Sequence, residues 1–148
     1  MKYKMSYATV KNIDVEGVVL PNHPLTNFEL LDAAKKLNIP NFRGVFLRDE
    51  LPQKPRRNEC GILNLDGSSG VGKHWCSFLK NGKEKFYFDS YGLPPPTELI
   101  KYLQRPLLYN SERIQPDGQV YCGHLCLYVL KKMCNDGCEF QEVINELH

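Results

Sequence analysis

The sequence lacks the segments that would place the protein in or across a membrane. It contains no apolar run approaching ~20 residues, which excludes a transmembrane helix. The start, Met1 to Ser6, has no apolar region of the signal-peptide kind, and neither end carries a lipidation motif. Repeats and low-complexity tracts are also absent. We therefore expect an intracellular protein of the cytoplasm or nucleus that makes no membrane contact.

The chain also lacks a strong charge of either sign. Its net charge is +2 and its pI is near 8.2, which does not by itself predict nucleic-acid binding. A charged fraction of 24% and an apolar fraction of 42% are typical of a folded domain and argue against disorder. A chain of 148 residues fits one domain, long enough to bury roughly two-thirds of its unfolded surface. We expect a single domain over 1–148, with 1–24 as an N-terminal arm or linker.

Cysteine is present six times, an even number that could suggest disulfides. Without a secretory signal, reduced thiols, metal ligands or a nucleophile are the better interpretation. The spacing of Cys122 and Cys126, followed by Cys134 and Cys138, has to be weighed as a zinc site. Structural zinc sites mostly use tighter knuckles in loop-rich modules. We therefore prefer Cys126 as a buried helix residue and expect no metal and no cofactor.

Cys122 stands where a loop meets an apolar helix. Pro116-Asp117-Gly118 is a strong turn signal. The helix is indicated by the apolar spacing of the residues that follow, Leu125, Tyr128, Val129 and Met133. A thiol at a helix start feels the positive end of the helix dipole, which favours the thiolate, the nucleophilic form. Burial as an inert packing residue is the alternative, because Cys is often buried.

Three further residues could complete a catalytic site around that thiol. His74 can act as a base, Asp89 can orient the imidazole, and the side-chain amide of Gln115 can serve as an oxyanion donor. Each residue also has an ordinary structural interpretation. His74 can be a strand residue whose ring is hydrogen-bonded, Asp89 can belong to a turn at the end of a strand, and Gln115 alone has no particular meaning. Their joint order along the chain, ahead of Cys122, favours the catalytic interpretation.

Local patterns predict an α+β fold, a mixed central sheet flanked by helices with the nucleophile at the start of a core helix. In the first helix, a capping box from Thr26 to Glu29 marks the start. Its buried face is predicted to carry Phe28, Leu31, Ala34 and Leu37. The remaining expected helices are 98–104, 122–133 and 139–147, and the expected strands are 42–47, 60–65, 74–79, 85–89 and 107–114.

A hairpin can bring the base and its orienter together. Asn81-Gly82 is a turn dipeptide between two β-rich runs, and His74 and Asp89 lie seven or eight residues from it on opposite strands. The loop before His74 resembles a phosphate-binding loop only superficially. His74 occupies the position where Ser or Thr must bind Mg²⁺, and a strand pattern follows instead of a helix. An NTPase is therefore a poor interpretation.

The segments containing His74-Trp75, Phe88 to Gly92, Gln115 and Cys122 to Cys126 resemble the adenovirus-type cysteine proteases (adenain). More broadly they are similar to the clan that includes the SUMO and ubiquitin-like proteases. The resemblance runs from about Phe42 to Leu147, and the sequence of these segments looks closest to adenain-like proteases of Polinton-type transposons and related viruses. Adenain itself carries Glu at the position of Asp89, and this chain is shorter than the adenovirus enzyme.

The resemblance implies a cysteine endopeptidase with His74 as general base, Asp89 as its orienter, Gln115 as oxyanion donor and Cys122 as nucleophile. It implies processing of the structural proteins of a virus or virus-like transposon, location in a virion as a further compartment, and activation by a peptide or by DNA. We expect a monomer that acts on protein or peptide substrates. Two alternatives stay open: a ubiquitin-like or SUMO deconjugase or acetyltransferase of the same clan, and a non-enzymatic zinc-binding or assembly module.

Overall fold

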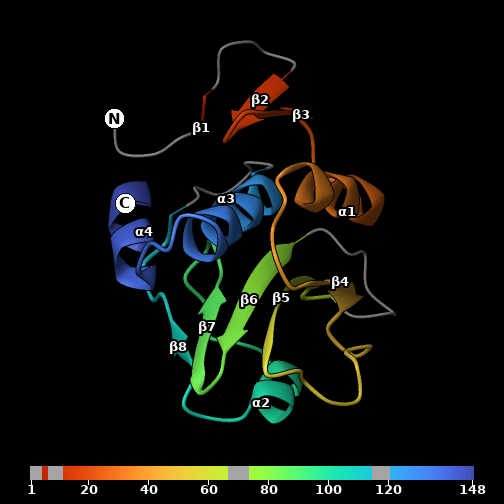
Figure 1. Cartoon of the computed structure of the whole chain (residues 1–148), viewed down its shortest axis with the longest axis vertical. Coiled ribbons are helices and arrows are strands. Elements are labelled where there is room, and N and C mark those ends of the chain that lie inside the picture. Colours follow the sequence, from red (N-terminus) through yellow and green to blue (C-terminus); the bar gives the residue numbers. More distant parts are fainter. Residues whose placement is uncertain (1–4, 7–11, 67–73, 115–120) are drawn as a thin grey trace.

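The computed structural model describes residues 5–6, 12–66, 74–114 and 121–148, and its centre is a mixed five-stranded sheet (Figure 1). The strand order is β4-β5-β6-β7-β8, with parallel pairing at the two edges and antiparallel pairing between. The bounds are β4 Phe42–Leu47, β5 Asn58–Asn64, β6 Trp75–Asn81, β7 Glu84–Phe88 and β8 Leu108–Tyr109. The predicted α+β class with a mixed sheet is confirmed.

Alternate residues of the central strands enter two different cores, as the two-residue period of a strand requires. Cys60, Ile62, Trp75 and Phe88 face a large core that contains α1, α3 and α4. Leu63, Cys76, Phe78 and Tyr87 face a smaller core closed by α2. The sheet is therefore buried on both faces. The helix bounds are α1 Asn27–Lys36, α2 Thr97–Leu103, α3 Cys122–Cys134 and α4 Phe140–Leu147.

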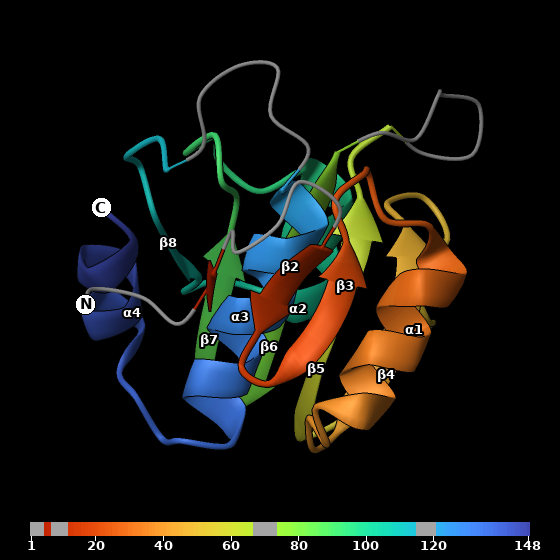
Figure 2. The same ribbon diagram turned by 90° about the horizontal axis from the view of Figure 1, so that it is seen from above.

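A second, antiparallel sheet covers α3 on the side away from the five strands (Figures 1 and 2). It consists of β1 Met5–Ser6, β2 Asn12–Val15 and β3 Val18–Pro21. Ile13, Val15 and Leu20 are buried in the large core. Residues 12–21, within the segment expected as an arm or linker, thus form strands that pack on the core helix.

The capping box of α1 is confirmed, because Thr26 Oγ1 accepts from the Glu29 amide and the Glu29 carboxylate accepts from the Thr26 amide. The predicted buried face of this helix is partly wrong. Phe28 and Leu31 are 76% and 42% exposed, whereas the buried positions are Leu30, Ala33, Ala34 and Leu37. Both sets have helical spacing, so the sequence alone did not separate them; packing on α3 and β4 selects the second set.

The predicted hairpin is confirmed, with Asn81 paired to Glu84 across a turn in which Gly82 has φ +62°. The expected strand over 107–114 is much shorter, since β8 contains two residues. After Tyr109 the chain leaves the sheet because Asn110 bonds the backbone of Asp89 and Glu112, and the Ile114 amide donates to the Ser90 carbonyl at 2.7 Å. No helix of the described ranges is long and apolar enough to cross a bilayer.

Candidate active site

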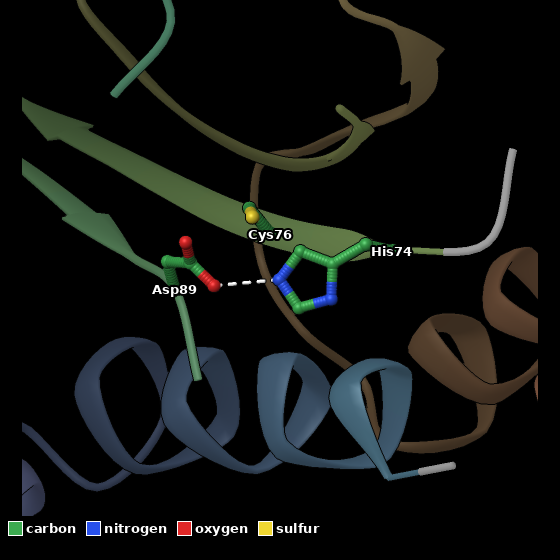
Figure 3. A group of neighbouring side chains, drawn as sticks. All are labelled: His74, Cys76 and Asp89. Carbon is green, nitrogen blue, oxygen red and sulfur yellow. Dashed lines mark hydrogen bonds and ion pairs between the residues drawn. The ribbon is translucent and has the colours of Figure 1, made fainter. Parts of the chain in front are cut away.

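The side chains of His74 and Asp89 form a close pair at one end of the hairpin, as Figure 3 shows. His74 Nε2 donates to Asp89 Oδ1 at 2.6 Å. The His74 side chain is 15% exposed, and that of Asp89 is fully buried. The last pair of the hairpin ladder joins Ser77 and Phe88, so Asp89, which directly follows β7, lies at the end of the hairpin where β6 begins after His74. The hairpin register therefore explains the contact that the sequence predicted.

The Asp89 carboxylate is fixed from its own turn. Its Oδ1 accepts the Tyr91 amide at 2.9 Å, and its Oδ2 accepts the Leu93 amide at 3.2 Å. A carboxylate held by backbone donors keeps one orientation, so the imidazole that donates to it is oriented too. The ring of Tyr91 also stacks on His74, with ring centroids 4.4 Å apart and planes 8° apart.

Cys122 is the first residue of α3, and its side chain meets the start of β6. The Trp75 amide donates to Cys122 Sγ at 3.5 Å. Cys122 is 4% exposed and also hydrogen-bonds His74. Because Nε2 of His74 is engaged by Asp89, Nδ1 is the ring nitrogen left to exchange a proton with the thiol.

The environment of His74 favours its protonated form. Burial alone lowers the pKa of this imidazole, but the hydrogen bonds and charges of Asp89 and Cys122 outweigh it and raise the pKa to about 9. An imidazolium near neutral pH is the partner that a thiolate needs. The arrangement can therefore supply a nucleophile and a proton donor at once.

The third predicted partner, Gln115, lies outside the described residues. The described chain approaches it as far as Ile114, whose amide is bonded to the turn that carries Asp89. The guanidinium of Arg113 lies over the ring of Tyr91, 4.8 Å from its centroid. The residues just before Gln115 are thus attached to the His74–Asp89 pair.

Asn110 is a site residue that the sequence analysis missed. It is 6% exposed, its Oδ1 accepts the Asp89 amide at 3.1 Å, and its Nδ2 donates to the Asp89 carbonyl at 2.7 Å and the Glu112 carbonyl at 3.2 Å. The side chain therefore holds the backbone of the orienter from behind. An isolated Asn in an apparent strand gave no signal of this role.

Trp75, the residue after His74, is buried in the large core. Its indole Nε1 donates to the Leu25 carbonyl at 2.8 Å. His124 acts similarly one turn into α3: its Nε2 donates to the Pro21 carbonyl at 2.8 Å, and burial lowers its pKa. These two bonds attach the segment between β3 and α1 to the residues beside His74 and Cys122.

Two possible metal groups have to be considered. Among the described residues, His74, Cys76 and Asp89 are the one group of three candidate ligands, with atoms within 4.8 Å of one another (Figure 3). Cys76 is completely buried in the smaller core, and burial, with the nearby Asp89 charge, raises the pKa of its thiol. The geometry therefore fits a hydrogen-bonded acid–base pair beside a packed thiol.

The alternative zinc set of Cys122, Cys126, Cys134 and Cys138 is wrong as a single site. Cys122 and Cys134 are the first and last residues of α3. Twelve steps of helix separate them by about 18 Å, several times the span of one ion's ligands. Cys126 is fully buried and its thiol donates to the Trp75 carbonyl at 3.4 Å, as expected for a core residue.

Comparison with solved structures finds a viral protease. The chain superposes on the crystal structure of the ASFV pS273R protease with a TM-score of 0.61 and 19% identity, covering 85% of this chain and 65% of that one. The selenomethionine form gives a TM-score of 0.58 and 20% identity over the same shares. No protein-family model and no curated protein matches the chain. At these identities the likeness concerns the fold, which is the predicted cysteine-protease fold of the ubiquitin-like-protease type.

Proposed function

We propose that the protein is a cysteine endopeptidase that uses Cys122, His74, Asp89 and Gln115. The observation that carries the proposal is the coincidence of three features in one place. A cysteine at a helix start bonds a histidine, the other nitrogen of that histidine bonds a buried aspartate, and the surrounding fold is that of a protease. The chain spans 65% of the length of that protease, so substrate and regulation are proposed for this chain separately.

The reaction follows from the roles. Cys122 gives its proton to His74 Nδ1, and the thiolate attacks a peptide carbonyl. The amide of Gln115 and the backbone N–H of Cys122 stabilise the oxyanion; losing one such donor typically raises the barrier by ~3–4 kcal/mol. His74 then returns the proton to the leaving amine as the C–N bond breaks. Water, deprotonated by His74, hydrolyses the thioester and frees the Cys122 thiol.

For the biological substrate, we propose structural proteins of a virus or virus-like transposon, in line with the adenain-like resemblance and the viral origin of the structural neighbour. The test is incubation with the capsid proteins encoded beside this chain, followed by mass spectrometry of the cut sites. Cleavage by the native protein and none by Cys122→Ala is the expected result. Labelling of Cys122 by an electrophile based on a ubiquitin-like C-terminus, without capsid cleavage, would instead favour a deconjugase.

The catalytic pair is tested without any substrate. A thiol reagent should label Cys122 rapidly, and the His74→Ala variant should slow this labelling by about tenfold or more, because the imidazolium no longer stabilises the thiolate. Cys126, buried one turn along the same helix, is the internal reference. Labelling of Cys122 no faster than that of Cys126 would contradict the whole assignment. Cys126→Ala is expected to lose stability through a core cavity and to keep its activity.

A further inference from the structure

Two cysteines that the proposed reaction does not use meet near the end of α3 opposite Cys122. Cys60, in the second strand β5, is fully buried on the face that packs against α1, α3 and α4, and its thiol donates to the Pro40 carbonyl at 3.6 Å. Cys134 is the last residue of α3 and packs against the same core. The two thiols hydrogen-bond each other.

A hollow in the protein surface lies beside Cys134. It has a volume of about 170 Å³ and is lined by Pro40, Cys134 and the side of Lys80, but Cys60 itself does not line it. One water takes about 30 Å³ in the liquid, so a small oxidant can enter this space. Cys134 is half-buried and Cys60 is fully buried. An incoming reagent therefore meets Cys134 first, with Cys60 behind it.

The two sulfurs are also chemically unequal. When Cys134 is ionised, its thiolate can accept the proton of the Cys60 thiol, and this bond lowers the pKa of Cys134. The same bond, together with burial, raises the pKa of Cys60. Cys134 thus ionises first and is the better nucleophile, while Cys60 stays a thiol that can hydrogen-bond it. The remaining internal thiols, Cys76 and Cys126, are completely buried, and burial raises the pKa of both.

We propose that Cys60 and Cys134 are an oxidation site, a dithiol that a peroxide converts into an intramolecular disulfide. The Cys134 thiolate attacks one peroxide oxygen, the O–O bond breaks, and the released hydroxide takes a proton to become water. Cys60 sulfur then attacks the sulfenic sulfur of Cys134, the S–S bond forms, and the S–O bond breaks with loss of a second water. Two thiols and one hydrogen peroxide thus give one disulfide and two waters.

The product would link the sheet to the far end of the nucleophile helix. It closes the chain between β5 and the last residue of α3, so the unfolded state of the oxidised protein is restricted and its melting temperature rises. The site lies about 18 Å along the helix from Cys122, so it is distinct from the proposed catalytic thiol.

The experiment uses the full chain with Cys122→Ala, which removes the competing thiol and makes the outcome independent of the proposed function. After hydrogen peroxide treatment, free thiols are alkylated in denaturant and the digest is analysed without reduction. The expected product is a peptide pair joined through Cys60 and Cys134 that separates on reduction. Its formation should be at least about tenfold faster than oxidation of Cys76 or Cys126, which are buried.

Further variants separate the two steps. Cys60→Ser should let Cys134 stop at the sulfenic acid, trapped by dimedone, because the second sulfur is missing. Cys134→Ser should leave Cys60 unmodified, since Cys60 is buried behind it. Cys138→Ser is the matched control, a half-buried thiol near the same helix end, and should leave the cross-link unchanged. A disulfide between Cys134 and Cys138, or full recovery of alkylated Cys60 and Cys134, would overturn the proposal.

Discussion

At the scale of single residues, the charge state of His74 is set by the groups that surround it. The imidazole donates to a buried carboxylate and bonds the thiol of Cys122, and its pKa is raised to about 9 despite burial. The folded chain therefore holds this proton more tightly than the unfolded chain does. The raised pKa should therefore affect both the reactivity of the site and the stability of the fold, and both can be measured.

His74 should contribute a pH-dependent stabilisation of definite sign. Because its folded pKa is above the unfolded value of 6.5, the full contribution, up to about 3 kcal/mol, is present below pH 6.5 and is lost as the pH rises through about 9. Urea unfolding of the native chain and of His74→Gln is measured at several pH values. The difference between the two chains isolates the contribution of His74 to the free energy of unfolding. An equal loss of stability in both chains between pH 6.5 and 9 would contradict it.

Asn110 should be needed for turnover through the position of Asp89. Asn110→Ala removes three hydrogen bonds to the backbone of Asp89 and Glu112 and should lower kcat by about tenfold or more, with little change in KM. The rate is expressed per folded molecule. Asn135→Ala is the control, since this amide donates to the Asn38 carbonyl at 2.8 Å beyond the opposite end of α3. Equal kcat values for the two variants would exclude the role.

At the scale of elements, two short segments have to meet for the site to form. The turn after β7 carries Asp89, and the segment after β8 leads toward Gln115. They touch at Gly92, which has φ +73° and where an added Cβ would lie 2.8 Å from the Glu112 carbonyl carbon. Backbone contact this close leaves no space for a side chain.

Gly92→Ala should therefore destabilise the fold by more than the backbone conformation alone requires. Gly137 is the matched control, because its φ is +71° and no atom lies within 4 Å of an added Cβ. We expect the free energy of unfolding, measured with urea, to fall by about 1 kcal/mol in Gly137→Ala and by at least about 3 kcal/mol in Gly92→Ala. Similar losses in the two variants would mean that the two segments separate easily.

At the scale of the whole molecule, the small N-terminal sheet is part of the same core as the nucleophile helix. Ile13 and Val15 are completely buried against α3, and the segment that follows is fixed by the bonds from Trp75 and His124. The two sheets and α3 between them should therefore unfold together.

Ile13→Ala should lower the free energy of unfolding by ~2–5 kcal/mol in a single transition with an unchanged m value, since it removes buried methyl groups from a shared core. Val19→Ala is the control on the paired strand, because Val19 is 63% exposed and should cost less than about 0.5 kcal/mol. A separate early transition in Ile13→Ala would show instead that the strands are an independent arm.

Local patterns in the sequence determined those parts of the protein that depend on near neighbours. The Asn81-Gly82 turn predicted a hairpin that brings His74 to Asp89, and the apolar spacing after Cys122 predicted the helix that begins at this cysteine. Tertiary packing decided the rest. The contact of the Trp75 amide with Cys122 joins residues 47 positions apart, and the Asn110 bonds to Asp89 join residues 21 apart. The buried face of α1 likewise depended on what packs against it, because two faces had helical spacing and only long-range contact distinguishes them.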